Sequence, residues 1–236
     1  MLPKAMFSRT LSTSTSALRM NIVVILSGGM DSTTLLYHHL RNGDTVKALS
    51  IDYGQKHKKE IDFAKKTCAK LNIDHRVADL SGITDLIDSS ALTGIGDVPE
   101  GHYADDSMKA TVVPNRNMIM MAVAIGWAIN EGFDGVSYGA HFGDHAIYPD
   151  CRTEFADAMD RVAGLCDYEP VSIYRPFITL TKDEICAIGD SLGVDWGDTW
   201  SCYNGRDAHC GKCGTCVERI EAFKLAKVED PTAYES

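Results

Sequence analysis

A short segment near the amino end has the composition of a turn that binds phosphate groups: Ser27-Gly-Gly-Met-Asp-Ser32. It follows an apolar run and precedes a helical pattern, so the backbone N–H groups of the first helical turn point outward without partners. Gly28 and Gly29 lack the Cβ atoms that would keep an anion away from the backbone, while Ser27 and Ser32 add hydroxyl donors. Asp31 could orient a hydroxyl group or hold Mg²⁺. A bare Gly-Gly pair more often marks only a tight turn with a serine cap, so its context must decide.

A second group with chemical potential lies near the carboxyl end, where four cysteines cluster: Cys202, Cys210, Cys213 and Cys216. Four thiolates suit one tetrahedral Zn²⁺ per chain, and this site would be structural because no coordination position stays open for water. A redox-active Cys-x-x-Cys pair, two disulfides and an iron–sulfur cluster are the alternatives, and His209 could replace one sulfur. The remaining cysteines are scattered singly, which favours a reducing, cytoplasmic compartment.

The charge of the chain argues against two classes of partner. Its 236 residues include 23 basic and 33 acidic ones, a net charge of −10, so the average surface repels nucleic-acid backbones and anionic membranes. The longest apolar stretch has about twelve residues, whereas a membrane-spanning helix needs about twenty. We therefore expect neither a nucleic-acid partner nor a membrane partner.

Apolar runs that alternate with helical patterns predict βαβ units and an α/β fold. Strands are expected at 21–26, 45–52, 75–80 and 135–138, within a parallel sheet of about five strands. Helices are expected at 33–40, 55–71 and 115–131, and a further helix begins at the capping box Thr181-Lys-Asp-Glu184 and ends at Gly193. The polar stretch 81–112 is expected to be a functional lid or a disordered excursion. The apolar residues of the helix at 115–131 are expected in the core: Met118, Met120, Met121 and Trp127.

The first nineteen residues differ in composition from the rest, with Lys4, Arg9 and Arg19, no acid, and a run rich in Ser and Thr. A disordered leader has this composition, and so has an organelle transit peptide. We expect the ATP-binding domain to span residues 20–200. The four-cysteine segment and a helix, residues 201–236, are expected to pack on that domain.

Residues 21–227 resemble the 7-cyano-7-deazaguanine synthases, which belong to the PP-loop ATP pyrophosphatases. The glycine turn is similar to their S-G-G-x-D-S motif. Further matching segments are Asp52-Tyr-Gly-Gln-Lys-His57, Val113-Pro-Asn-Arg-Asn117, Gly139-Ala-His141, Tyr148-Pro-Asp-Cys-Arg152 and Trp200-Ser-Cys202. The resemblance implies a Rossmann-like fold of the adenine-nucleotide α-hydrolase type, bound zinc and a homodimer. It also implies a C–N ligase that makes a nitrile from 7-carboxy-7-deazaguanine, ammonia and ATP, in queuosine biosynthesis.

The resemblance also suggests site residues. The nucleotide-binding stretch would be Leu26, Ser27, Gly28, Gly29, Met30, Asp31, Ser32, Thr33, Thr34, Leu35 and Leu36, with Mg²⁺ on the phosphate groups. Catalysis is expected to involve Asp31, Ser32 and Arg116.

Other polar residues have two interpretations each. Arg116 and Asn117 would neutralise the substrate carboxylate or a phosphate, or else form a surface cap and salt bridge. The run Lys56-His-Lys58 would complete a cationic pocket, although such runs are more often solvated helix faces. Asp144 and Asp150 would read the donors of the base, or else form loop salt bridges.

Two other functions are compatible with these motifs. A PP-loop enzyme that thiolates or otherwise modifies tRNA would share the glycine turn, although the acidic charge argues against it. A non-enzymatic zinc module that binds nucleic acid would share the cysteines but would not hydrolyse ATP.

Overall fold

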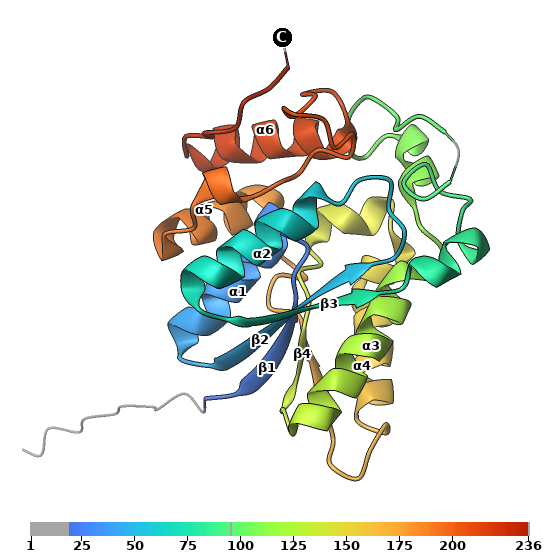
Figure 1. Cartoon of the computed structure of the whole chain (residues 1–236). Coiled ribbons are helices and arrows are strands. Elements are labelled where there is room, and N and C mark those ends of the chain that lie inside the picture. The colour runs from blue at the N-terminus through green and yellow to red at the C-terminus, as the bar shows by residue number, and fades with distance from the viewer. Residues whose placement is uncertain (1–18, 95, 236) are drawn as a thin grey trace, which may run out of the picture.

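The amino-terminal strand of the fold is a continuous apolar run, β1 (Asn21–Ile25), at the centre of a parallel sheet (Figure 1). The structure is a computed structural model, and it describes residues 19–94 and 96–235. Within these residues the sheet has five strands in the order β3-β2-β1-β4-β5, which confirms the predicted α/β fold. The other strands are β2 (Thr45–Asp52), β3 (Asp74–Asp79), β4 (Gly135–Ser137) and β5 (Ser172–Tyr174). The expected leader lies outside the described residues, except for Arg19.

Helices cover both faces of the sheet because alternate residues of β1 point to opposite sides. Ile22 and Val24 pack with α1 (Met30–Asn42) and α2 (Lys59–Leu71). Val23 and Ile25 pack with α3 (Arg116–Glu131) and α4 (Thr153–Ala163) on the other face. Two more helices extend the first layer: α5 (Lys182–Leu192) packs on α1, and α6 (Gly214–Ala226) packs on α5 (Figure 1).

The strand order places a crevice at the carboxyl end of β1. From β1 the chain proceeds to β2 and β3 on one side, and it then crosses to β4 and β5 on the other. Loops that leave β1 and β4 therefore diverge to opposite faces of the sheet and leave room between them, which is where open α/β sheets bind ligands. This crevice is the first place to look for a site.

Several predicted elements need correction. The helix expected at 55–71 begins only at Lys59, because Gly54 adopts a φ of +83° and Gln55 accepts a hydrogen bond from the Tyr53 N–H. The polar stretch 81–112 contains two short 3₁₀ helices, η1 (Ser81–Leu86) and η2 (Asp106–Thr111).

Of the four residues of α3 expected in the core, one is placed wrongly, Met118. Met121 is fully buried, and Met120 and Trp127 are partly buried against the core. Met118 is 44% exposed, because the face of α3 that carries it points away from the sheet. None of the helices in the described ranges is both long and apolar enough to cross a membrane.

Candidate active site

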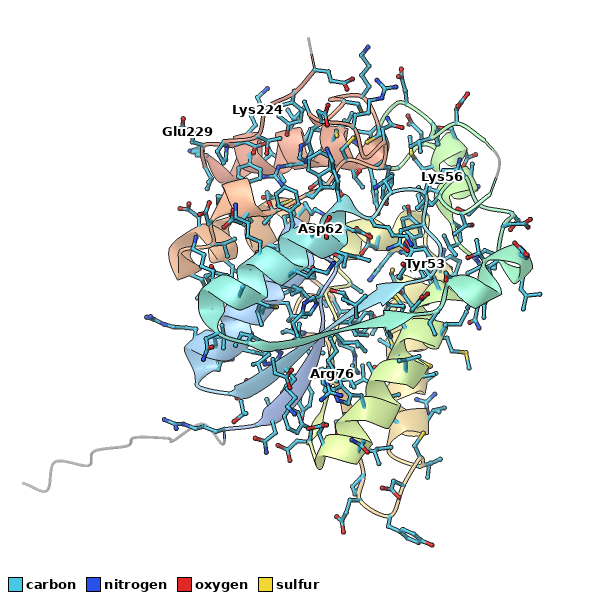
Figure 2. All side chains as sticks on the ribbon, in the orientation of Figure 1. Tyr53, Lys56, Asp62, Arg76, Lys224 and Glu229 are labelled. Atoms are coloured by element: carbon cyan, nitrogen blue, oxygen red, sulfur yellow. The ribbon has the colours of Figure 1, made fainter. Side chains whose placement is uncertain are left out.

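A cavity of about 230 Å³ lies at the carboxyl ends of β1, β2 and β4. The turn after β1 forms its floor, and the segments after β2 and β4 form two of its walls. The turn after β2 carries Tyr53 and Lys56 (Figure 2), of which Tyr53 lines the cavity and Lys56 does not. The start of α3 and the four-cysteine segment complete the enclosure. Lys182 of α5 also lines it, so the cavity gathers parts of the chain that are far apart in sequence.

The turn after β1 requires glycine at position 28. Gly28 has a φ of +91°, and a Cβ atom there would lie 2.1 Å from the carbonyl oxygen of Glu60. Gly29 is the N-cap of α1, and its N–H donates to Ser27 Oγ at 3.2 Å. The Ser32 hydroxyl is 3.0 Å from that of Ser27, so both hydroxyls face the same turn. Backbone and hydroxyl donors converge at a helix start, the arrangement that binds an anion.

The predicted nucleotide-binding stretch divides into two parts. The cavity wall includes Leu26, Ser27, Gly29, Met30, Asp31 and Ser32. Gly28, Thr33, Thr34, Leu35 and Leu36 are buried and do not line the cavity; the last two belong to the apolar core. Only the first part is positioned to contact a ligand directly.

Asp31 forms an ion pair that the sequence motifs do not indicate. Its Oδ2 is 2.6 Å from the ammonium of Lys182, the first residue of α5, and Glu218 Oε2 of α6 lies 3.1 Å from the same ammonium. Burial alone would lower the pKa of Lys182, but the surrounding carboxylates outweigh it and raise that pKa above its usual range. Lys182 therefore stays cationic beside the turn after β1 at neutral pH.

His141 and Asp144 form the next part of this network. The His141 ring is 1% exposed; its Nδ1 accepts a hydrogen bond from the Gly143 N–H, and its Nε2 lies 3.2 Å from Lys182. Asp144 accepts hydrogen bonds from the Tyr103 hydroxyl at 2.9 Å and from the His141 N–H at 3.2 Å. Burial opposes ionisation of Asp144, but the neighbouring His141 and Lys182 lower its pKa. Asp144 is thus an ionised, well-anchored carboxylate.

Arg116 lines the cavity from the start of α3. Its guanidinium lies 5.9 Å from the ring centres of both Tyr53 and Tyr148. Within the described residues no carboxylate forms an ion pair with it, and its buried Nε has no hydrogen-bond partner. Glu60 also lines the cavity, and burial raises its pKa to about 7, although Arg116 and Gln55 oppose the shift. A partly buried guanidinium that forms no ion pair with a carboxylate of the described residues is suited to an anionic ligand.

The other predicted polar residues have partners within the protein. Asn117 donates to the carbonyl of Asp150 at 3.0 Å, and its N–H donates to the Asp150 carboxylate, so both tie α3 to the loop after β4. Lys58 pairs with Asp52, and Lys56 donates to the carbonyl of Gly96. Neither lysine lines the cavity, whereas His57 between them does.

The four cysteines form one buried group whose sulfur atoms lie within 4.8 Å of one another. A tetrahedral ion with bonds of about 2.3 Å would separate the sulfur atoms by about 3.8 Å, and Cys210 and Cys216 are 3.9 Å apart. Backbone N–H groups of Asn204 and Cys210 donate to the sulfur of Cys202, as in thiolate metal sites. All eight cysteines are unpaired. The group could therefore hold a metal ion.

His209 has a different role from the four sulfur atoms. Its Nε2 accepts a hydrogen bond from the Ser201 N–H at 3.1 Å, and its ring packs 4.1 Å from that of Trp200. The nitrogen is thus already used within the protein. The structure assembles a set of four sulfur atoms without it.

Lys182 and Glu218 are absent from the residues that the sequence motifs single out. One local signal does point to Lys182: a cation at the first position of a helix is unfavourable, because the helix dipole is positive there. Such a lysine indicates an anionic neighbour or ligand. Glu218 has no comparable signal, because its partner is 36 residues away in sequence.

Comparison with known proteins agrees with this geometry. The family described as "Queuosine biosynthesis protein QueC" matches residues 21–227. A 7-cyano-7-deazaguanine synthase of Alteromonas mediterranea is 55% identical over 215 residues, which cover 91% of this chain and 99% of that protein. A protein of the same name from Methanoregula boonei is 53% identical over 216 residues, 92% of this chain and 100% of that protein.

A solved structure shares the fold at much lower identity. NMN synthetase from Francisella tularensis superposes with a TM-score of 0.52 and 14% identity, over 89% of this chain and 79% of that one.

Proposed function

The chain belongs to the family of queuosine biosynthesis protein QueC, and on that premise we propose that it converts 7-carboxy-7-deazaguanine, ammonia and ATP into 7-cyano-7-deazaguanine. The reaction is that of an enzyme that forms C–N bonds. One observation carries the proposal: the phosphate-binding turn and the Lys182 ammonium share a cavity with the unpaired guanidinium of Arg116. A triphosphate and a carboxylate can thus be neutralised side by side.

The first half of the reaction makes an amide. A carboxylate resists attack by ammonia because hydroxide is a very poor leaving group at neutral pH. An oxygen of the substrate carboxylate attacks the α-phosphorus of ATP, which forms an acyl adenylate and releases pyrophosphate onto the turn after β1. Ammonia then attacks the acyl carbon, AMP leaves with that oxygen, and one proton is released. The product is the primary amide.

The second half repeats the activation on the amide. Its oxygen attacks the α-phosphorus of a second ATP, and pyrophosphate leaves again. Loss of AMP from the adenylated amide, with loss of the remaining N–H protons, leaves the C≡N bond. Because both steps activate an oxygen at the same carbon, one site can perform both.

We assign roles in this scheme to the turn after β1, Lys182, Arg116 and Tyr53. The turn with Ser27, Gly28, Gly29 and Ser32 binds the departing pyrophosphate, and Lys182 neutralises charge that develops on the α-phosphate. Arg116 binds the substrate carboxylate and turns one oxygen toward the phosphorus. The Tyr53 ring beside Arg116 lines the cavity and offers an apolar surface suited to a flat base.

Mg²⁺ would spread the negative charge of the phosphate groups. Asp31 fits such an ion, because its Oδ1 is buried without a hydrogen-bond partner in the described residues while Oδ2 binds Lys182. Oxygen atoms of Asp31 and of the phosphates are the ligands that Mg²⁺ prefers.

We assign Zn²⁺ to the group of Cys202, Cys210, Cys213 and Cys216. Four thiolates in tetrahedral reach of one centre are the commonest structural zinc site, and they leave no position for a reacting water. The ion would order the carboxyl-terminal segment.

The resemblance also suggests a homodimer that acts in the cytoplasm and has no nucleic-acid partner. The exposed apolar side chains Met118, Val162 and Leu165 lie on or next to α3 and α4, which cover the same face of the sheet. Between Arg116 and Glu131 the chain has no charged residue, so two acidic chains can meet there without repulsion. Met118→Asp should shift the mass in solution from dimer to monomer, and an unchanged mass would locate the contact elsewhere.

The proposed reaction is tested by mass spectrometry of purified protein incubated with the acid, ATP and ammonium. The nitrile should appear and require all three compounds. Absence of nitrile together with ATP-dependent modification of tRNA would favour the thiolating alternative. Salt-dependent binding of nucleic acid without ATP hydrolysis would favour the non-enzymatic zinc module.

A further inference from the structure

The four-cysteine group is connected to the phosphate-binding turn through a short series of contacts. Cys213 is the N-cap of α6, Cys216 lies in the first turn of that helix, and Glu218 follows two residues later. Glu218 Oε2 is 3.1 Å from the Lys182 ammonium, which is 2.6 Å from Asp31 Oδ2. The Glu218–Lys182–Asp31 contacts therefore link α6, which carries Cys216, to α1, the helix that follows the turn after β1.

Glu218 points inward and lies behind Lys182, which lines the cavity. Its side chain is 12% exposed, whereas Lys224 and Glu229, farther along the same segment, are exposed (Figure 2). A Cβ atom on Gly143 would lie 2.9 Å from His141 Cε1 and 3.1 Å from Glu218 Oε1, so the loop after β4 passes close to both side chains. Glu218 Oε2 accepts no hydrogen bond from the described residues, and its partner is the charge of Lys182.

A lysine ammonium needs more than one partner to have a fixed position. The side chain has several rotatable bonds, and holding them costs about 2 kcal/mol of conformational entropy. Besides Asp31 Oδ2 at 2.6 Å, the ammonium lies 3.1 Å from Glu218 Oε2 and 3.2 Å from His141 Nε2. Glu218 is the second carboxylate that holds the ammonium, and Lys182 itself lines the cavity in which the phosphates of ATP would lie.

The four-cysteine group determines the position of the Glu218 carboxylate. Two of its four ligands, Cys213 and Cys216, belong to the N-cap and first turn of α6. Thr215 between them donates to the carbonyl of Ser201 at 2.7 Å, and both residues line the cavity. The backbone N–H of Trp200 donates to the carbonyl of Gly28 at 2.9 Å. The cysteine segment is therefore part of the active-site wall.

We propose that Glu218 is a positioning residue, which holds Lys182 for ATP activation and makes the active site depend on the four-cysteine group. The inference rests on the proposed function in assigning Lys182 to ATP. The structural part of the inference is that Glu218 and the bound metal fix the position of Lys182. This part can be tested without substrate.

The test compares Glu218→Ala, Glu218→Gln and a matched control, Glu221→Ala, in the metal-loaded full chain. Glu221 lies on the same helix and pairs with His102 at 3.3 Å on the surface. Glu218→Ala should lower kcat about 10- to 100-fold with little change in the KM for the acid, Glu218→Gln should recover part of the loss, and Glu221→Ala should stay within about twofold of the parent.

The second readout is the rate at which an amine-reactive ester labels Lys182, measured by mass spectrometry without substrate. Labelling relative to Lys47 should rise several-fold in Glu218→Ala and in the parent protein after chelation of its metal, with the circular dichroism of the sheet and helices retained. Unchanged Lys182 labelling in Glu218→Ala would overturn the positioning role. Unchanged labelling after chelation would overturn the dependence on the metal, whether or not nitrile is formed.

Discussion

The carboxylate of Asp31 lies 2.6 Å from the ammonium of Lys182, a pair that joins the first turn of α1 to the first residue of α5. The pair accounts for an electrostatically unfavourable feature, a lysine at the positive end of a helix dipole. Asp31 and the second carboxylate, Glu218, stabilise that charge, and its place beside the turn after β1 supports the proposed role in ATP activation.

Replacement of Lys182 should impair chemistry more than folding. We expect Lys182→Met to lower kcat/KM about 10²- to 10³-fold, because it removes a preorganised charge from the site of phosphoryl activation. Steady-state formation of the amide and nitrile measures the effect. Lys70→Met is the control, since Lys70 pairs with Asp195 on the surface. A Lys182→Met enzyme within threefold of the parent would remove the lysine from the mechanism.

Replacement of Arg116 should act on the acid rather than on ATP. Arg116→Met removes the unpaired guanidinium, so the KM for 7-carboxy-7-deazaguanine should rise about 10- to 100-fold. Calorimetric titration should find the Kd for ATP nearly unchanged. Arg152→Met is the control, because Arg152 is exposed and donates to a loop carbonyl. A loss of ATP affinity with an unchanged KM for the acid would reassign Arg116 to the phosphates.

The four-cysteine group should contribute to stability through its metal. Cys213→Ser removes one of four ligands, and we expect metal content below one ion per chain and a clearly lower Tm. Elemental analysis and thermal unfolding measure the two effects. Cys166→Ser is the matched control, because that cysteine is exposed and outside the group. Full metal content in Cys213→Ser would refute the ligand assignment.

Glu60 should make the ligand-free protein less stable as pH rises. Burial raises its pKa from 4.5 to about 7 in the folded state, so between these values the folded chain holds a proton that the unfolded chain has released. Stability therefore falls as pH rises through this window. Glu60→Gln removes this dependence, so relative to the parent it should gain about 1–3 kcal/mol in unfolding free energy between pH 4.5 and pH 8.

Denaturant unfolding at the two pH values measures that gain. The exposed Glu154 provides the control variant, Glu154→Gln, for which the difference from the parent should not change with pH. An equal difference at both pH values for Glu60→Gln would show that the carboxylate is solvated.

The sequence predicts those parts of the fold and site that depend on neighbouring residues. The turn at Ser27–Ser32 lies between an apolar run and a helical pattern, and the four clustered cysteines lie within fifteen residues, so both groups can be proposed from the sequence alone. The capping box at Thr181 likewise fixed the start of α5, and both of its hydrogen bonds are present. Local spacing is sufficient where the ligands or caps belong to one segment.

Long-range relationships could not be predicted in the same way. Lys182 and Glu218 meet because α6 packs on α5. No local pattern in either helix indicates that the two side chains form a pair. The strand β5 has only three residues and lies at the edge of the sheet, so no apolar run marks it. Met118 is exposed although its helix is apolar. The apolar pattern of a helix does not show whether a given apolar face packs on the core of the same chain or is open to a partner, so the exposure could not be predicted.

The fate of the substrate oxygen tests the central claim, that the acid is activated by attack on the α-phosphorus of ATP. The measurement uses 7-carboxy-7-deazaguanine labelled with ¹⁸O in both carboxylate positions, with ATP and ammonium, and mass spectrometry of the nucleotide products. Attack on the α-phosphorus should give nitrile and one ¹⁸O atom in each AMP. Label in inorganic phosphate with ADP as the nucleotide product, or nitrile formed with unlabelled AMP, would contradict it.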